Sequence, residues 1–200
     1  MHRTAEARAR AVLESRGIAR SKHLEQAGVS RTQIQRLVER GVIERVGWGL
    51  YRDPKAPQSE RADLAEVARL VPGGVVCLLS ALRFHGLTTQ NPFQVWVAID
   101  RKAWRPQVDH PPLRFAFLSG PSLTEGVEEH PVDGVTVRVY SAAKTVADCF
   151  KFRNKLGIDV AVEALRAYRE AHPKGLEAVW RFAEINRVAR VIRPYLEAVG

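Results

Sequence analysis

The sequence predicts an α+β protein with two parts. A helical N-terminal segment ends in a β-hairpin, and a mixed domain with a small sheet and C-terminal helices follows it. Three observations support this prediction: helix signals between residues 4 and 40, strand-like runs at 42–52, and a second group of strand-like runs at 94–140 with helical patterns on both sides. Hydrophobic residues make up 46% of the 200, which is enough for a folded core.

Three helices are predicted in the N-terminal segment. Thr4–Arg16 is rich in strong helix formers and Gly17 ends it, and Ser21 is the expected N-cap of a helix over Lys22–Ala27. The third start signal is the clearest. Ser30 precedes Gln33 by three residues, which is the spacing of a capping box, and a helix to about Arg40 follows.

The second and third helices are joined by so short a link that they must cross steeply, which is typical of a helix-turn-helix. After them, Val42–Val46 and Leu50–Arg52 are two β-prone runs joined by Gly47-Trp48-Gly49. Residues 1–55 are therefore predicted to form a winged helix-turn-helix domain.

A linker is predicted at Asp53–Ser59, where two prolines stand among polar residues, and residues 56–200 are predicted to form the α+β domain. Ser59 is the expected cap of its first helix. The turn before its last strand is expected at Asp133-Gly134. The predicted helices are 59–70, 75–85, 141–152, 158–171, 174–183 and 185–199, the last with a break near Pro194, and the strands are 94–99, 113–118, 127–130 and 135–140.

The basic charge is concentrated in the predicted N-terminal domain. The chain has a net charge of +9, and residues 1–55 carry 12 basic and 6 acidic residues, which is +6 of that total. An excess of arginine on a recognition element is typical of nucleic-acid binding, whereas many basic proteins bind no nucleic acid at all. The position of the charge therefore favours double-stranded DNA as the partner.

Candidate DNA contacts lie at the start of the second helix, along the third helix and on the hairpin. Arginine suits guanine edges and phosphates, and glutamine suits adenine. The alternative is a winged-helix domain that contacts only proteins. The candidate residues are Lys22, Ser30, Arg31, Thr32, Gln33, Gln35, Arg36, Arg45, Trp48 and Arg52.

No secretory signal or membrane-spanning stretch is recognisable, so we expect a cytoplasmic protein without a membrane partner. Cys77 and Cys149 are expected to be buried free thiols. We expect no enzymatic activity, no cofactor and no metal. The weak alternative is a metal-dependent nuclease built on Asp100 and Lys102, with Glu66 as the second carboxylate.

Three segments, in order along the chain, resemble the AbiEi-type antitoxins of bacterial type IV toxin–antitoxin systems, which act in abortive infection. They are GVSRTQIQRLVERGVIERVGWGLYRD (Gly28–Asp53), LLSALRFHGLT (Leu78–Thr88) and YSAAKTVADCFKFRNKLGID (Tyr140–Asp159). The resemblance implies a winged helix that binds inverted repeats in its own promoter and represses transcription. It also implies an antitoxin domain, and a nucleotidyltransferase-like toxin that this domain opposes without a stable complex.

The family's helix motif falls on Ser141, Lys144, Thr145 and Asp148. The spacing of these residues also permits a purely structural interpretation, with Ser141 as an N-cap and Asp148 as a local salt-bridge partner. A plain regulator whose second domain senses a ligand or a partner is the main alternative function. Binding to inverted repeats would need a dimer or two cooperating monomers.

Overall fold

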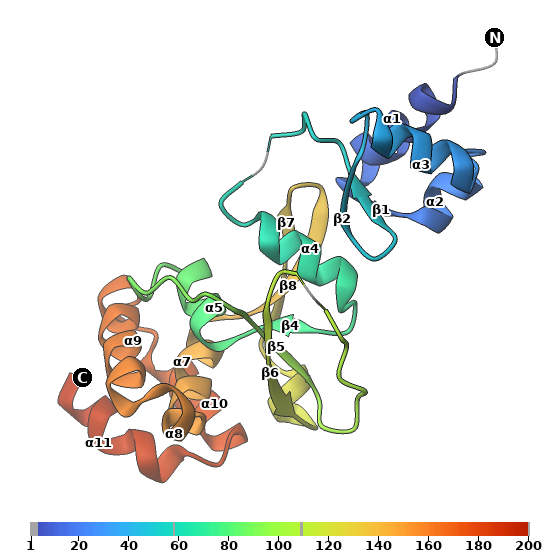
Figure 1. Ribbon diagram of the computed structural model, residues 1–200. Helices are drawn as coiled ribbons and strands as arrows, with labels where there is room; N and C mark the ends of the chain where they lie inside the picture. Colours follow the sequence, from blue (N-terminus) through green and yellow to red (C-terminus); the bar gives the residue numbers. More distant parts are fainter. Residues whose placement is uncertain (1–3, 58, 109, 200) are drawn as a thin grey trace. The chain divides into compact units, whose positions relative to one another are not determined.

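A computed structural model describes residues 4–57, 59–108 and 110–199, and it has the mixed α+β character that the sequence predicts (Figure 1). The described chain forms two compact units. The N-terminal unit comprises the chain up to Gly73 together with Pro106–Pro111 and His130–Val137, and the C-terminal unit comprises the remainder. Gln58, in the predicted linker, lies outside the described residues.

Every helix and strand predicted for residues 1–55 is present in the N-terminal unit, with small shifts at the ends. Two further elements belong to it: a short strand after the first helix, and a helix after the linker. The elements are α1 (Ala5–Arg16), β1 (Ile18–Arg20), α2 (Ser21–Gln26), α3 (Arg31–Glu39), β2 (Glu44–Gly47), β3 (Leu50–Arg52) and α4 (Ala62–Leu70).

The capping box of α3 is confirmed. The Gln33 amide N–H donates to Ser30 Oγ (3.3 Å), and the Ser30 amide N–H donates to Gln33 Oε1 (2.9 Å). Two predicted caps are wrong. Ser21 is the first residue of α2, whose N-cap is Arg20, and Ser59 precedes the N-cap of α4, which is Arg61. Ser59 instead donates its hydroxyl to Asp133 Oδ2 at 3.1 Å.

The N-terminal unit has an antiparallel sheet in the order β1-β3-β2. Side chains alternate between its two faces, and directly paired residues share a face. On one face Ala19 and Tyr51 join the core that α1, α2 and α3 build, so we call it the bundle face. Leu37, Leu24 and Ala9 are among the buried residues of that core.

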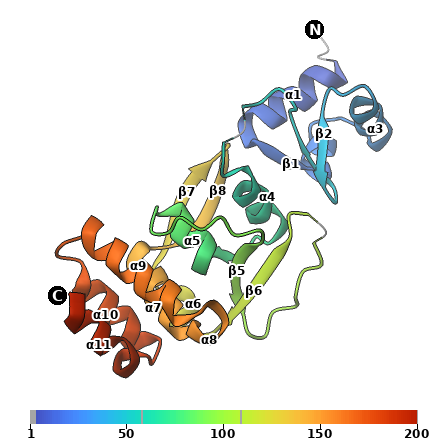
Figure 2. The ribbon, with the colours of Figure 1, turned by 60° about the vertical axis from the view of Figure 1, so that its left-hand side comes forward.

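The opposite face of this sheet is covered by α4, so we call it the α4 face (Figure 2). Arg52 lies on it and its Nη1 donates to Glu66 Oε1 of α4 (3.3 Å). At the other end of α4, Arg20 donates to the Arg69 carbonyl (2.5 Å), and Arg69 donates to the Arg16 carbonyl (3.0 Å). The compact unit is therefore larger than the segment 1–55 for which a separate domain is predicted.

The second sheet has the strand order β6-β5-β4-β8-β7. β4 is antiparallel to β5 and parallel to β8, and β5 is parallel to β6. The predicted Asp133-Gly134 turn joins β7 to β8, and both residues have positive φ, +47° and +73°, as a tight hairpin turn requires. The bounds are β4 Val75–Val76, β5 Val95–Asp100, β6 Leu113–Leu118, β7 Val127–Val132 and β8 Val135–Tyr140.

Two helix predictions need correction. The first residues of the predicted helix 75–85, Val75 and Val76, form β4, because β-branched residues pair well in a buried strand. The predicted break near Pro194 is also wrong. A residue with positive φ, Arg187 (+59°), separates α10 from α11, and Pro194 lies inside α11. The helices are α5 Leu78–Phe84, α6 Pro121–Thr124, α7 Ala142–Lys151, α8 Arg153–Leu156, α9 Ile158–Ala171, α10 Leu176–Ile185 and α11 Ala189–Val199.

The core of the C-terminal unit is centred on α7, which packs against α5, α9 and α10 (Figure 2). Eight of the ten residues of α7 are buried. Cys77 and Cys149 are buried free thiols, as predicted. Burial raises the pKa of both thiols, so neither is a ready nucleophile.

Candidate nucleic-acid interface

The exposed side of α3 carries the residues that the sequence places there. Ile34 and Leu37 are buried in the bundle core, whereas Thr32, Gln35 and Arg36 are exposed. The 3.6-residue period of the helix thus separates an apolar side from a polar one. Thr32, Gln35 and Arg36 form one surface from which side chains can reach a ligand.

Two candidate residues at the start of α3, Ser30 and Gln33, form its capping box. The Ser30 hydroxyl and the Gln33 side-chain amide each hold a backbone N–H of the first turn. These bonds satisfy donors that the start of a helix leaves without partners. Ser30 and Gln33 therefore position α3, and they are less available to a ligand than Gln35 and Arg36.

Two of the exposed residues, Arg31 and Gln35, form hydrogen bonds with acidic side chains. Arg31 Nε donates to Glu25 Oε1 (2.7 Å), which raises the pKa of the Arg31 guanidinium, yet the Arg31 side chain is 88% exposed. Gln35 Nε2 donates to Glu39 Oε1 (3.1 Å). A polyanion that approached α3 would compete with Glu25 for Arg31.

The tip of the β2–β3 hairpin presents Trp48, whose side chain is 89% exposed. Arg45 donates to the Gly47 carbonyl (3.2 Å), and its guanidinium carbon lies 5.7 Å from the centroid of the Trp48 ring. The hairpin therefore offers a cation and an exposed aromatic ring side by side.

A groove of about 450 Å³ separates α3 from the β2–β3 hairpin. It contains the basic residues of both elements, Arg31 and Arg45, together with Gln35. Tyr51, which is not among the predicted contact residues, also lines it. The alternation of side chains along β3 could have placed Tyr51 on the same face as its partner, Arg45. Residues of α3 and of the hairpin therefore line the same groove.

Arg52 is placed elsewhere. As a neighbour of Tyr51 along β3 it points to the α4 face, where Nε donates to Glu44 Oε2 (2.8 Å) and Nη1 to Glu66. Its side chain is only 18% exposed. The structure therefore separates Arg52 from the groove, and its charge is offset by two carboxylates.

At the start of α2, Lys22 is exposed on the surface of the first turn. The neighbouring His23 accepts a hydrogen bond from the Arg20 amide N–H at Nδ1 (3.2 Å). Burial lowers the pKa of His23, and the charges of Arg16 and Lys22 lower it further, which favours the neutral ring that this bond requires.

The motif at 141–148 lies in the interior of the C-terminal unit. Ser141 caps α7 by accepting from the Lys144 amide N–H (3.4 Å), and Lys144 Nζ lies 2.6 Å from both carboxylate oxygens of Asp148. Lys144, Thr145 and Asp148 are all 0% exposed. The structural interpretation of Ser141 and Asp148 is thus confirmed.

Two further side chains complete this buried network. Asn186 donates to Asp148 Oδ1 (2.6 Å), and the Lys144 ammonium lies 4.1 Å from the centroid of the Tyr140 ring. Desolvation raises the pKa of Asp148, while Lys144 opposes that shift. A charged pair with these partners links α7 to the loop that follows α10.

The residues of the alternative nuclease site have local roles. Asp100 Oδ1 accepts from the Lys102 amide N–H (2.7 Å), a turn contact, and Glu66 pairs with Arg52. In the part of the chain that the structure describes, no group of three or more His, Cys, Asp or Glu side chains could hold a metal ion.

Residues 7–52 match the model of a family of transcriptional regulators. The family is described as "Transcriptional regulator, AbiEi antitoxin". The match begins within α1 and ends with β3, so it confirms the resemblance over the segment that contains α3 and the hairpin. No curated protein matches the chain. None of the described helices combines the length and the apolar character that crossing a membrane needs.

Proposed function

We propose that α1–α3 and the β2–β3 hairpin form a winged helix-turn-helix that binds double-stranded DNA in a sequence-specific manner. The observation that carries this proposal is the groove between the exposed side of α3 and the hairpin, which holds Arg31, Gln35 and Arg45. α3 would enter the major groove, with Thr32 and Arg36 at base edges or phosphates. Arg45 and Trp48 would lie along the adjacent backbone or minor groove, and Lys22 would contact flanking phosphates.

The match to a family of transcriptional regulators and antitoxins extends the proposal from binding to regulation. In this proposal the protein is cytoplasmic and represses its own promoter at inverted repeats. It is also the antitoxin of a type IV, abortive-infection system with a nucleotidyltransferase-like toxin, and it needs no stable complex with that toxin. The proposal requires no catalysis.

The test is a binding assay with the full chain and the DNA upstream of its own gene, beside random DNA of equal length, at two salt concentrations. Specific binding would exceed non-specific binding by about 10³-fold or more, and both would weaken as salt rises. Equal affinity for the two DNAs would contradict autorepression, and the lack of any complex at low salt would contradict DNA binding.

The antitoxin function needs a separate experiment. Expression of the neighbouring nucleotidyltransferase-like gene should arrest growth, and co-expression of this protein should restore it. Failure of the rescue, with both proteins present at comparable levels, would refute the antitoxin part while leaving DNA binding untouched.

A further inference from the structure

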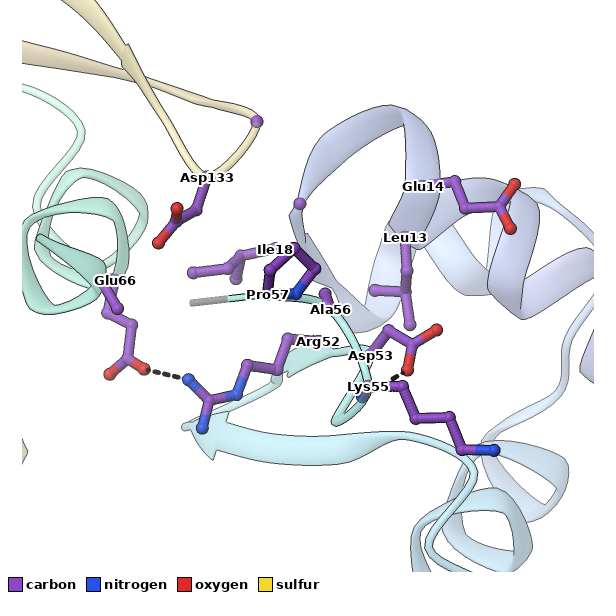
Figure 3. A pocket seen from close by; sticks show the side chains of 13 residues that line it. Leu13, Glu14, Ile18, Arg52, Asp53, Lys55, Ala56, Pro57, Glu66 and Asp133 are labelled. Carbon is purple, nitrogen blue, oxygen red and sulfur yellow. Dashed lines mark hydrogen bonds and ion pairs between the residues drawn. The ribbon is translucent and has the colours of Figure 1, made fainter. Parts of the chain in front are cut away.

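A second hollow lies in the N-terminal unit, on the α4 face of its sheet (Figure 3). This cavity has a volume of about 480 Å³, within the range of small-molecule sites. Its walls come from α1, the β1 and β3 strands, the segment after β3, α4 and the Asp133-Gly134 turn. The groove beside α3 opens on the bundle face instead, so the two hollows are distinct.

One part of the cavity wall is apolar. Its side chains come from the C-terminal end of α1, from β1, from the segment after β3 and from α4, and they offer contact area but no hydrogen bonds. They are Leu13, Ile18, Ala56, Pro57 and Ala62. A ligand must therefore carry a compact apolar body to fill this part of the space.

The other part of the wall is acidic. Four acidic residues, Glu14, Asp53, Glu66 and Asp133, line the cavity, against two basic ones, Arg52 and Lys55. In Figure 3 the Glu14 carboxylate points away from the other side chains of the lining. The Arg52 guanidinium is already bound by Glu66 and by Glu44, which lies outside the lining. An anionic ligand would meet an excess of carboxylates, whereas a cation would be attracted.

Glu66 supplies an independent sign that a partner is missing. Glu66 is only 6% exposed, and while its Oε1 accepts from Arg52, no residue that the structure describes donates a hydrogen bond to its buried Oε2. Buried carboxylate oxygens are normally satisfied, so an orphaned one calls for an explanation. Desolvation also raises the pKa of Glu66.

We propose that this cavity binds a small organic cation, an ammonium or amidinium group on a compact apolar body. The cationic group would lie toward Glu66 and Asp133, which Figure 3 draws on the same side of the cavity, and the apolar body would pack on Leu13 and Ile18. The side chain of Asp133 is held by the Ser59 hydroxyl, which donates to its Oδ2 (3.1 Å). This assignment does not rest on DNA binding.

The probe is phenethylamine, compared with its neutral analogue 2-phenylethanol and with the anion phenylacetate, all titrated into the full chain by calorimetry or NMR. We expect a dissociation constant on the order of millimolar for the ammonium, as its few atoms allow. The alcohol should bind at least about tenfold more weakly, and the anion should not bind. Equal binding of all three, or binding of none, would overturn the proposal.

Three variants locate the site. Glu66→Gln and Asp133→Asn each keep a hydrogen-bond acceptor and remove the charge, and each should weaken amine binding about tenfold. Ala56→Phe, on the exposed segment after β3, should fill the cavity and abolish binding without changing any charge. Glu197→Gln, an exposed carboxylate on α11, is the matched control. The assignment would be refuted if the first three variants still bound the amine, or if binding fell equally in the control. Unfolding transitions that match that of the unmodified protein show that the variants are folded.

Discussion

Asp148 illustrates how one buried residue can carry a large share of stability. It is fully buried, and it neutralises Lys144 at 2.6 Å while accepting from Asn186. Removing one member of such a pair leaves the other charge buried and unpaired. The same arrangement gives Ser141, Lys144 and Asp148 structural roles in α7.

We therefore expect Asp148→Asn to lower the free energy of unfolding by about 3–5 kcal/mol, measured by urea denaturation. The double variant Lys144→Met with Asp148→Leu should recover much of that loss, because it removes both charges together. The exposed control Glu197→Gln should stay within about 0.5 kcal/mol of the unmodified protein. A loss under about 1 kcal/mol for Asp148→Asn would contradict the inferred role of the pair.

The pH dependence of stability should reflect Glu66. Burial raises its pKa above the usual 4.5, so this carboxyl binds its proton more tightly in the folded than in the unfolded chain. Its stabilising contribution is complete below the unfolded pKa and is lost as the pH rises through the raised folded pKa.

The unfolding free energy of the unmodified protein should therefore fall, relative to that of Glu66→Gln, as the pH rises above the ordinary pKa of 4.5. Denaturant titrations of both proteins across this window give the difference directly. A difference that stays constant, or that grows with pH, would show that the ion pair with Arg52 outweighs desolvation.

At the scale of the element, α3 is the part whose role a substitution can test most directly. Arg36→Ala removes an exposed cation and leaves the cap and the buried side of the helix unchanged. We expect specific promoter binding to weaken by about 1–3 kcal/mol if Arg36 contacts a base. An equal loss on all DNAs, with a salt slope reduced by about one charge, would assign Arg36 to a phosphate.

Arg166→Ala, an exposed arginine of α9, is the control for that experiment and should leave promoter binding unchanged. If Arg36→Ala binds every DNA with the affinity of the unmodified protein, Arg36 does not contact DNA.

Local signals predicted most of these elements. The capping box of α3, the Asp133-Gly134 turn and the bounds of α9 follow from residues close together in the chain. The position of Arg52 did not follow, because it depends on which face of the sheet α4 covers. That packing involves residues such as Glu66, which lies fourteen positions away. The sequence did not predict β1, because a strand of three residues is too short to show an alternating pattern of side chains.

At the scale of the whole molecule, the proposed recognition of inverted repeats requires two copies of α3 on one face of the DNA. Two copies that contact each other, as a dimer or as cooperating monomers, fix the spacing and the phase of the half-sites. We expect an insertion of about five base pairs between the half-sites to reduce binding strongly, since it turns one half-site to the opposite side of the helix.

An insertion of about ten base pairs restores the phase and should recover part of the affinity. The measurement is a titration of the full chain on three promoter fragments that differ only in this spacing. Unchanged binding to the five-base-pair insertion would show that the copies bind independently.

The turn between β7 and β8 has one more consequence. Gly17 has positive φ, and an added Cβ there would lie 1.8 Å from the Asp133 carbonyl oxygen, so the backbone of the turn lies directly against the end of α1. The N-terminal unit therefore includes a segment, His130–Val137, that the ribosome makes long after α3 and the hairpin. During synthesis, the contact between α1 and the turn can form only after residues 130–137 have been added to the chain. A chain truncated before His130 would therefore leave that side of α1 exposed.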